Sequence, residues 1–263
     1  MNNFIILKIG EIVGCYYFGL KKNKKIIIYA LGAPTVPDNG KLEGVSMFID
    51  KGFDVFVPDY LGFGRSDGLF TPDNCIKTLV FLNNKFSKGV LGIDHYLNKE
   101  IFLKYKEIVF IGRSLGGAYV PLLPKYIKSL INIALFFPAV DQVSQGSIEN
   151  EETNEDFMRT MKYSGYKHLY RGILLKCWPK HLESKDGLSP MENIHLLKNV
   201  RVFIAHGKKD SCISYKKSLK YYNKIIEKFP EKEKQFKLKI YNEGGHNSIT
   251  TSKAIKDFLK WLE

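Results

Sequence analysis

Residues 108–117 read IVFIGRSLGG and carry the clearest indication of the fold. An apolar run typical of a buried strand leads into the five residues GRSLG (112–116), and a helical pattern follows over 115–127. The two glycines allow the chain to turn sharply, because side chains at those positions would collide with neighbouring backbone. The pattern therefore predicts a strand–turn–helix unit that presents the Ser114 hydroxyl at the edge of a sheet.

Short apolar runs recur along the chain and predict the strands of a parallel sheet. Their apolarity is continuous rather than alternating, as expected of strands covered by helices on both faces. The runs are residues 26–30, 54–58, 108–112, 131–137, 201–206 and 237–241. Helical patterns are found at residues 41–51, 75–86, 115–127, 215–229 and 252–261. This alternation predicts an α/β fold with a mostly parallel, doubly wound sheet flanked by helices.

Two segments depart from this alternation. Residues 4–9 and 12–18 predict an antiparallel hairpin at the N-terminus. Residues 142–187 are too long for an ordinary connection and predict an inserted helical cap or lid over Ser114. We therefore expect an α/β core of residues 1–141 and 188–263. The segment is aromatic and includes Phe157. Four further aromatic residues form either the cap's own small core or a substrate contact, and they are Tyr163, Tyr166, Tyr170 and Trp178.

A serine hydroxyl needs a positioned base, usually histidine, and an acid that orients that base. His246 follows a late apolar run in YNEGGH (241–246), where two glycines allow a tight loop over the sheet. Asp210 follows the run RVFIAH, and catalytic groups of open parallel sheets gather at the carboxyl ends of strands. Asp141 follows an earlier run and is the alternative acid. His206 ends its own run and is interpreted as a packed core histidine.

The order Ser114, Asp210, His246 agrees with the order of nucleophile, acid and base in one known fold of this type. The oxyanion formed in the tetrahedral intermediate also needs two N–H donors. The Leu115 N–H follows the serine directly, and the Ala33 N–H follows the run 26–30 in the sequence LGAP. These two backbone groups are the predicted oxyanion hole.

The chain resembles the α/β-hydrolase superfamily over nearly its whole length. Besides the turn at Ser114 and the residue order, DYLGFGRSDG (59–68) is similar to the family's turn after an early strand, and Leu188-Ser189-Pro190 also looks familial. Where many relatives carry His-Gly, this chain has Leu31-Gly32. The resemblance is greatest to the esterase and serine-peptidase-like branch, and it implies a Ser-His-Asp hydrolase with no metal and no organic cofactor.

Composition narrows the class of protein further. The chain is 44% hydrophobic and 25% charged, and it has no apolar stretch of the length that spans a membrane. Its four cysteines form no CxxC pair, and the N-terminus lacks a signal-peptide pattern, so a cytoplasmic protein is expected. The net charge of +13 comes mostly from dispersed lysines, and it does not by itself predict a nucleic-acid partner.

The expected activity is hydrolysis of a carboxylic ester through an acyl-enzyme intermediate, on a small ester or a short peptide-like substrate. A serine aminopeptidase or a thioesterase would show the same triad, because the fold does not determine the leaving group. A non-catalytic binding protein that has inherited the fold is the third alternative. It would be expected to have a broken triad or a broken oxyanion loop.

Overall fold

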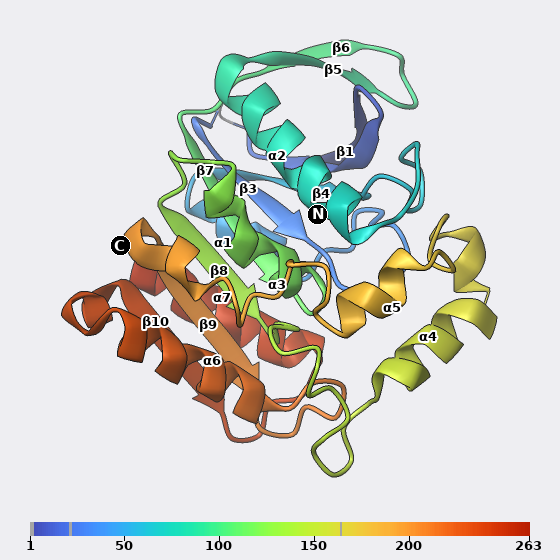
Figure 1. Cartoon of the computed structure of the whole chain (residues 1–263). Coiled ribbons are helices and arrows are strands. Elements are labelled where there is room, and N and C mark those ends of the chain that lie inside the picture. The colour runs from blue at the N-terminus through green and yellow to red at the C-terminus, as the bar shows by residue number, and fades with distance from the viewer. Residues whose placement is uncertain (1–2, 21–22, 164) are drawn as a thin grey trace.

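The computed structural model describes residues 3–20, 23–163 and 165–263. Residues 1, 2, 21, 22 and 164 belong to the predicted core and cap ranges and lie outside the described residues. The strands are β1 (Asn3–Ile9), β2 (Ile12–Phe18), β3 (Lys25–Ala30), β4 (Phe53–Pro58), β5 (Val90–Asp94), β6 (Glu100–Leu103), β7 (Glu107–Arg113), β8 (Asn132–Phe136), β9 (Arg201–Gly207) and β10 (Phe236–Tyr241). They form one sheet in the order β10-β9-β8-β7-β3-β4-β2-β1-β5-β6 (Figure 1).

The sheet has a parallel half and an antiparallel half. Strands β10, β9, β8, β7, β3 and β4 pair in parallel, and this half includes every strand that leads to a predicted site residue. Strands β4, β2, β1, β5 and β6 pair antiparallel. The predicted mostly parallel sheet with an N-terminal antiparallel hairpin is therefore confirmed.

The helices cover both faces of the sheet. They are α1 (Val45–Asp50), α2 (Pro72–Lys88), α3 (Gly116–Tyr119), α4 (Asn154–Tyr163), α5 (Cys177–Leu182), α6 (Tyr215–Lys228) and α7 (Ser248–Leu262). Shorter 3₁₀ helices are η1 (Val120–Lys125), η2 (Tyr166–His168), η3 (Ile194–Asn199) and η4 (Pro230–Gln235). Helices α1 and α7 pack on one face, and α2, α3 and α6 pack on the other.

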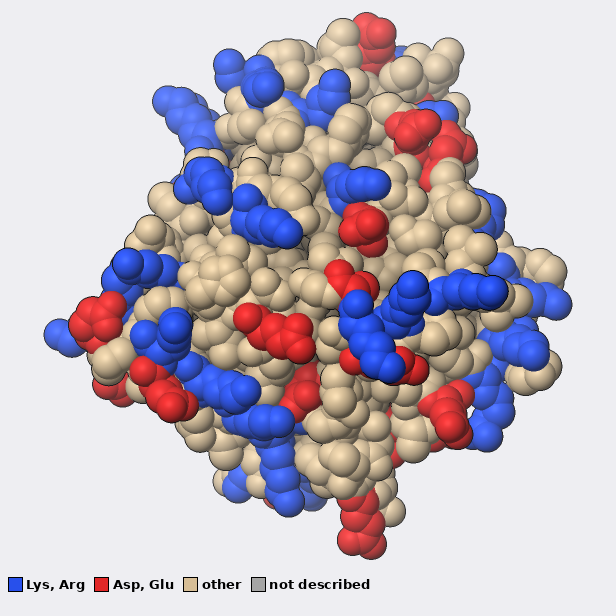
Figure 2. Space-filling model, viewed as in Figure 1, with Lys and Arg blue, Asp and Glu red and all other residues tan. Residues whose placement is uncertain are grey.

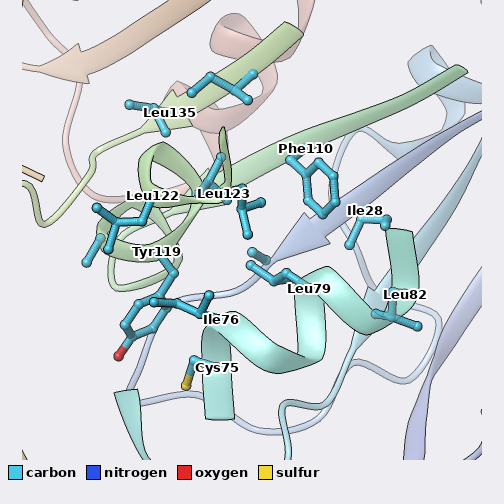
Figure 3. Packing of buried hydrophobic residues seen from close by; sticks show 14 of the residues in the cluster. Ile28, Cys75, Ile76, Leu79, Leu82, Phe110, Tyr119, Leu122, Leu123 and Leu135 are labelled. Carbon is cyan, nitrogen blue, oxygen red and sulfur yellow. The ribbon is translucent and has the colours of Figure 1, made fainter. Parts of the chain in front are cut away.

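Strand β3 shows why the predicted strands are apolar without alternation. Ile26 and Ile28 belong to the core beneath α2 and α3, whereas Ile27 and Tyr29 belong to the core beneath α1 and α7. Figure 3 shows the first of these cores, in which Ile28 and Phe110 of the sheet lie across from side chains of α2. Both faces are buried, so every position of the strand favours an apolar side chain.

Two predicted helices differ clearly in extent, and one hairpin was not predicted. The helix expected over residues 115–127 is one α-turn, α3, followed by η1, because Pro121 and Pro124 cannot donate the backbone hydrogen bonds that continue an α-helix. The helix expected over 41–51 begins only after Gly44, which has a left-handed φ of 70°. The hairpin β5–β6 was not predicted, since its strands are short and mix exposed with buried side chains.

Residues 142–187 contain α4, η2 and α5, which lie together beside the carboxyl end of the parallel strands (Figure 1). Tyr170 and Trp178 of this segment are fully buried and join the main core. The Trp178 indole N–H donates to the Phe70 carbonyl at 2.9 Å, and the Tyr170 hydroxyl contacts the backbone of Thr35. The segment is thus packed firmly onto the rest of the molecule.

Charged side chains are spread over the surface. In the view of Figure 2, acidic residues are interspersed among the basic ones, which agrees with the dispersed lysines of the sequence. Within the described residues, no helix combines the length and the apolarity needed to cross a bilayer.

Candidate active site

Ser114 lies at the turn between β7 and α3 in a strained backbone conformation, with a φ of 53°. Its N–H donates to the Phe136 carbonyl at 2.9 Å, and its carbonyl accepts from Gly117 and Ala139 at 2.9 and 3.0 Å. These bonds hold the residue in a region that non-glycine residues seldom adopt. The side chain is thereby turned away from the strand and into a cavity.

The glycines on either side of Ser114 make room for this turn. A Cβ on Gly112 would lie 2.6 Å from the Gly116 carbonyl oxygen, and a Cβ on Gly116 would lie 2.1 Å from the Ala30 carbonyl oxygen. Both distances are far shorter than van der Waals contact. Any other residue would push the helix away from β7 or β3, which is the collision that the sequence pattern predicts.

Asp210 and His246 meet above the carboxyl ends of β9 and β10. The Oδ2 atom of Asp210 lies 2.8 Å from Nδ1 of His246. The Oδ1 atom of Asp210 accepts the N–H groups of Cys212 and Ile213, each at 2.9 Å, so the carboxylate is fixed by its own loop. With Nδ1 held by a carboxylate, the Nε2 atom of His246 is the one left to act on a substrate.

Close backbone contact brings these two loops together. A Cβ on Gly207 would lie 2.3 Å from the Gly244 carbonyl carbon, so neither loop could approach as it does with a side chain at residue 207. The Lys209 N–H donates to the Gly244 carbonyl at 2.7 Å and links the loops directly. Gly207, which was not singled out from the sequence, therefore allows the tight approach of the two loops.

His206 contributes to the site, although the sequence indicated only a packed core histidine. Its ring is fully buried, and Nε2 lies 2.8 Å from the Ile213 carbonyl and 3.2 Å from Oδ2 of Asp210. Two acceptors at Nε2 place the proton there, so Nδ1 accepts from the Ser218 hydroxyl at 2.7 Å. His206 thus supports the carboxylate from the side opposite His246.

The carboxylate of Asp210 is held in its charged form. Burial alone would raise its pKa, but hydrogen bonds from His206 and His246 outweigh burial and hold the pKa well below its usual range. Phe137 packs between the two histidines, with ring centroids 5.7 Å from His206 and 5.1 Å from His246. The charged group therefore lies in a dry, closely packed setting.

Ser114 and His246 line the same cavity, which has a volume of about 320 Å³. Phe157 and Leu182 of the 142–187 segment form part of its wall, so the segment reaches the cavity that contains Ser114. The other wall residues are Gly32, Ala33, Pro34, Thr35, Arg113, Leu115, Ala139, Gln142, Gln145, Glu152, Thr153, Asn154, Cys212 and Ile213. A cavity of this size suits a small organic substrate.

Ala33 and Leu115, the predicted oxyanion residues, both line this cavity. Within the described part of the chain, neither backbone N–H donates to another residue. Gly32 explains how the first loop comes so close, because a Cβ at this residue would lie 2.6 Å from the Cβ of Ser114. The Leu31-Gly32 pair thus keeps the glycine at the point of contact.

Asp141, the alternative acid, forms its hydrogen bond with Lys220 and not with His246. Its Oδ2 atom accepts from Nζ of Lys220 at 2.7 Å, and this partner holds its pKa below the usual value despite burial, which would raise it. Among the remaining histidines, His181 is buried between Asp186 and Gln142. Neither residue contacts His246.

Asp210, Cys212 and His246 also deserve comparison with a metal site, since each offers a ligand atom within 4.8 Å of the others. However, both oxygens of Asp210 already accept hydrogen bonds, and burial, followed by the charges of Asp210 and Glu152, raises the pKa of the Cys212 thiol to about 11. A metal would have to break those bonds and displace the thiol proton. The group fits a hydrogen-bonded pair better than a metal centre.

The sequence and the structure were compared with those of known proteins. A model of the prolyl oligopeptidase family matches residues 134–263, which include Asp210 and His246 but not Ser114. A search of the curated proteins finds no match to this sequence. The similarities below therefore come from solved structures.

An esterase of Pyrococcus furiosus is similar over 100% of this chain and 92% of its own, with 16% identity and a TM-score of 0.63. An acylaminoacyl peptidase of Pyrococcus horikoshii is similar over 99% of this chain and 41% of its own, with 14% identity and a TM-score of 0.65. An alpha/beta fold family hydrolase of Bacillus anthracis is similar over 98% of this chain and 99% of its own, with 17% identity and a TM-score of 0.60. These similarities show that the chain has the α/β-hydrolase fold.

Proposed function

We propose that this protein is a serine hydrolase that cleaves a carboxylic ester through an acyl-enzyme intermediate. The observation that supports this most directly is the 2.8 Å hydrogen bond between Asp210 and His246 at the cavity into which Ser114 turns. The three residues come from loops after three different parallel strands. A strained serine, an oriented imidazole and a buried carboxylate at one cavity are typical of an active site and not of an ordinary surface cluster.

The proposed reaction begins when Oγ of Ser114 attacks the ester carbonyl carbon and Nε2 of His246 takes the hydroxyl proton. The N–H groups of Ala33 and Leu115 stabilise the oxyanion of the tetrahedral intermediate. Collapse of this intermediate breaks the bond to the alcohol oxygen, which leaves with the proton from His246. Water then repeats the sequence on the acyl-enzyme, releases the carboxylic acid and regenerates the serine.

Asp210 would orient His246 and stabilise the imidazolium that forms in both steps. Its depressed pKa supports this role, because the carboxylate stays charged at every pH at which the histidine can act as a base. Its fixed position matters equally, since the Cys212 and Ile213 N–H groups leave it no other orientation.

The 142–187 segment is proposed to act as a cap that sets acyl-group preference. Phe157 is half-buried and reaches the cavity that contains Ser114, whereas Tyr170 and Trp178 are fully buried in the main core. Tyr170 and Trp178 therefore support neither a separate core of the cap nor a substrate contact, because they pack into the main core. Phe157 and Leu182 are the members of this segment that a hydrocarbon chain would touch.

A serine aminopeptidase is the second candidate, and a thioesterase is the third. The prolyl oligopeptidase family match and the similarity to an acylaminoacyl peptidase favour the peptidase. The similarity to an esterase over 92% of its length, against 41% for the peptidase, favours the ester. We also propose a cytoplasmic location, because Cys15 and Cys75 are buried free thiols.

A fluorophosphonate probe tests whether Ser114 is activated. We expect labelling of the wild type and none of Ser114→Ala. A panel of p-nitrophenyl esters of increasing chain length, beside aminoacyl p-nitroanilides and acyl thioesters, then ranks the leaving groups by kcat/KM. Faster cleavage of the anilides would assign the peptidase reaction, and the absence of labelling on a folded protein would exclude a serine hydrolase.

A further inference from the structure

Arg113, the residue before Ser114, has an unusual position for a charged side chain. It is half-buried, and it forms part of the wall of two cavities, the one that contains Ser114 and a second one of about 330 Å³. Its Nε atom is buried and has no hydrogen-bond partner. Among the described residues, the arginines that form ion pairs are Arg65 and Arg159. A buried guanidinium N–H without an acceptor is costly, so Nε of Arg113 favours an acceptor supplied by an anionic ligand.

A second unpartnered donor lies in the wall of the same second cavity. Tyr29 is fully buried, and its hydroxyl has no hydrogen-bond partner. Tyr29 pairs with Ile111 in the parallel register of β3 and β7, which places its side chain on the same face of the sheet as Arg113, two residues beyond Ile111. Burial raises the pKa of Tyr29 to about 12, while the charge of Arg113 opposes that rise, so the hydroxyl remains a neutral donor.

The two cavities adjoin each other, since Arg113 and Thr35 line both. A molecule whose carbonyl group lies at Ser114 could therefore extend a second group past Arg113. This geometry links the unpartnered donors to the substrate rather than to a remote surface.

The charges around the second cavity indicate what it could hold. Asp38 lines it, but its carboxylate already accepts from the Tyr17 hydroxyl and the Lys41 N–H. Lys41 and Glu43 also line it, and both are exposed to solvent. One fixed cation with two acidic neighbours suits a single negative charge better than a polyanion. A carboxylate carries one charge, and its two oxygens can accept the two parallel N–H groups of a planar guanidinium in a bidentate pair.

We propose that Arg113 and the Tyr29 hydroxyl form a carboxylate-binding subsite beside Ser114, and that the preferred esters carry a carboxylate. This inference rests on the proposed serine hydrolase activity and narrows its substrate class. The carboxylate belongs either to the acyl part or to the alcohol part of the ester. Matched substrates can separate these two sources.

Two pairs of esters test the subsite. The first pair is 4-carboxyphenyl butyrate and 4-carbamoylphenyl butyrate, which differ by the charge on the alcohol part. The second is the mono-p-nitrophenyl ester of adipic acid and its methyl ester, which differ by the charge on the acyl part. The readout is the ratio of kcat/KM for the charged ester to that for the neutral ester of the same pair.

We expect this ratio to exceed one in at least one pair and to fall about 10- to 100-fold in Arg113→Gln, the range of one charge-assisted hydrogen bond. Tyr29→Phe should lower the same ratio about 3- to 10-fold without loss of thermal stability, because its hydroxyl bonds to nothing in the protein. Arg159→Gln removes an exposed charge and should leave the ratio as in the wild type. If Arg113→Gln does not fold, Arg113→Lys replaces it; it keeps the charge but loses the bidentate geometry and should lower the ratio about 3- to 10-fold relative to the wild type, and an unchanged ratio would overturn the subsite.

A ratio at or below one in both pairs, or an equal ratio in the wild type and Tyr29→Phe, would overturn the subsite while the hydrolase activity stood. If fluorophosphonate does not label Ser114, the proposed function fails instead, and the subsite is then tested by binding. In that case 4-acetamidobenzoate should raise the melting temperature of the wild type but not that of Arg113→Gln. No rise in the wild type would reject the subsite as well.

Discussion

Nε2 of His206 lies 3.2 Å from Oδ2 of Asp210, the same oxygen that holds His246. One carboxylate oxygen thus lies between two imidazole rings, one fully buried and one at the cavity that contains Ser114. The buried ring is fixed in turn by the Ser218 hydroxyl and the Ile213 carbonyl. His206 is therefore expected to be a positioning residue for the proposed reaction.

His206→Phe tests this role. It removes the buried donor to Asp210, and we expect kcat to fall about 10-fold and the free energy of unfolding to fall by about 1 to 3 kcal/mol. Ser218→Ala is the matched control, because it breaks only the contact at Nδ1 and should keep kcat within about threefold. Equal kcat values for the two variants, measured with a p-nitrophenyl ester, would show that His206 has no positioning role in the reaction.

Acid stability should depend on Asp210. Its folded pKa lies below the ordinary value of about 3.9, so the unfolded chain takes up the proton first as the pH falls. The stabilisation is thus fully present above about pH 4 and is lost below it. We expect Asp210→Asn to be less stable than the wild type by about 1 to 3 kcal/mol at pH 7, and the gap to narrow at pH 3. Urea unfolding at both pH values measures this, and a constant gap would contradict the pKa shift.

The three proposed catalytic residues should act as a unit. Ser114→Ala and His246→Ala should each remove most of kcat, and the double variant should be scarcely worse than either one. Asp210→Asn should lower kcat by up to about 10⁴, because it favours the wrong imidazole tautomer. Asp141→Asn, which loses its charged bond to Lys220 but leaves His246 untouched, serves as the control. Strong loss in the control beside normal turnover by Asp210→Asn would reassign the acid.

Gly32→Ala should be unusually damaging for so small a change. The added Cβ would lie 2.6 Å from the Cβ of Ser114 and would displace the loop that presents the Ala33 N–H. We expect kcat to fall about 100-fold or more, the effect of losing one oxyanion donor. Gly187→Ala is a control with nothing within 4 Å of the new atom; its φ of 75° should cost about 1 to 2 kcal/mol of stability but leave kcat unchanged. Normal turnover by Gly32→Ala would mean that this loop is not part of the oxyanion hole.

Two aromatic residues of the 142–187 segment should respond differently to truncation. Trp178→Ala removes a fully buried ring and should cost about 3 to 5 kcal/mol of stability. Phe157→Ala lies at the cavity wall and should shift the preferred acyl chain toward longer esters while costing less stability. Chain-length profiles and urea unfolding of both variants separate the roles. An unchanged profile in Phe157→Ala would argue against the proposed cap function.

Much of the fold could be predicted because the sheet is buried on both faces. Runs such as residues 26–30 and 201–206 need apolar side chains at every position, and that requirement is visible in the sequence. Strand β6 is at the sheet edge and β5 is next to it, and both mix exposed with buried side chains, so no comparable requirement marks them. The prediction of one long helix after Ser114 was wrong for a different reason. Pro121 and Pro124 are visible in the sequence and already indicate that an α-helix cannot continue there.

The candidate site was predicted less completely. The glycines around Ser114 and before His246 allow tight turns, and a tight turn can be predicted from a few neighbouring residues. The acid could not be chosen firmly, because Asp141 and Asp210 both follow strands and only the loop geometry brings Asp210 to His246. The role of His206 depends on a loop that returns Asp210 and Ile213 to its ring, and no local pattern indicates such a return.

The parallel half of the sheet has a consequence for how the molecule gains its structure. Gly112, two residues before Ser114, pairs with Ala30 on one side and Leu135 on the other, and the loop of His246 reaches its place only after β10 has paired with β9. Such contacts between distant parts of the chain form slowly, because each closes a long loop. During refolding from urea, helical circular dichroism should therefore return well before hydrolytic activity does, and turnover would report the arrival of the last strand.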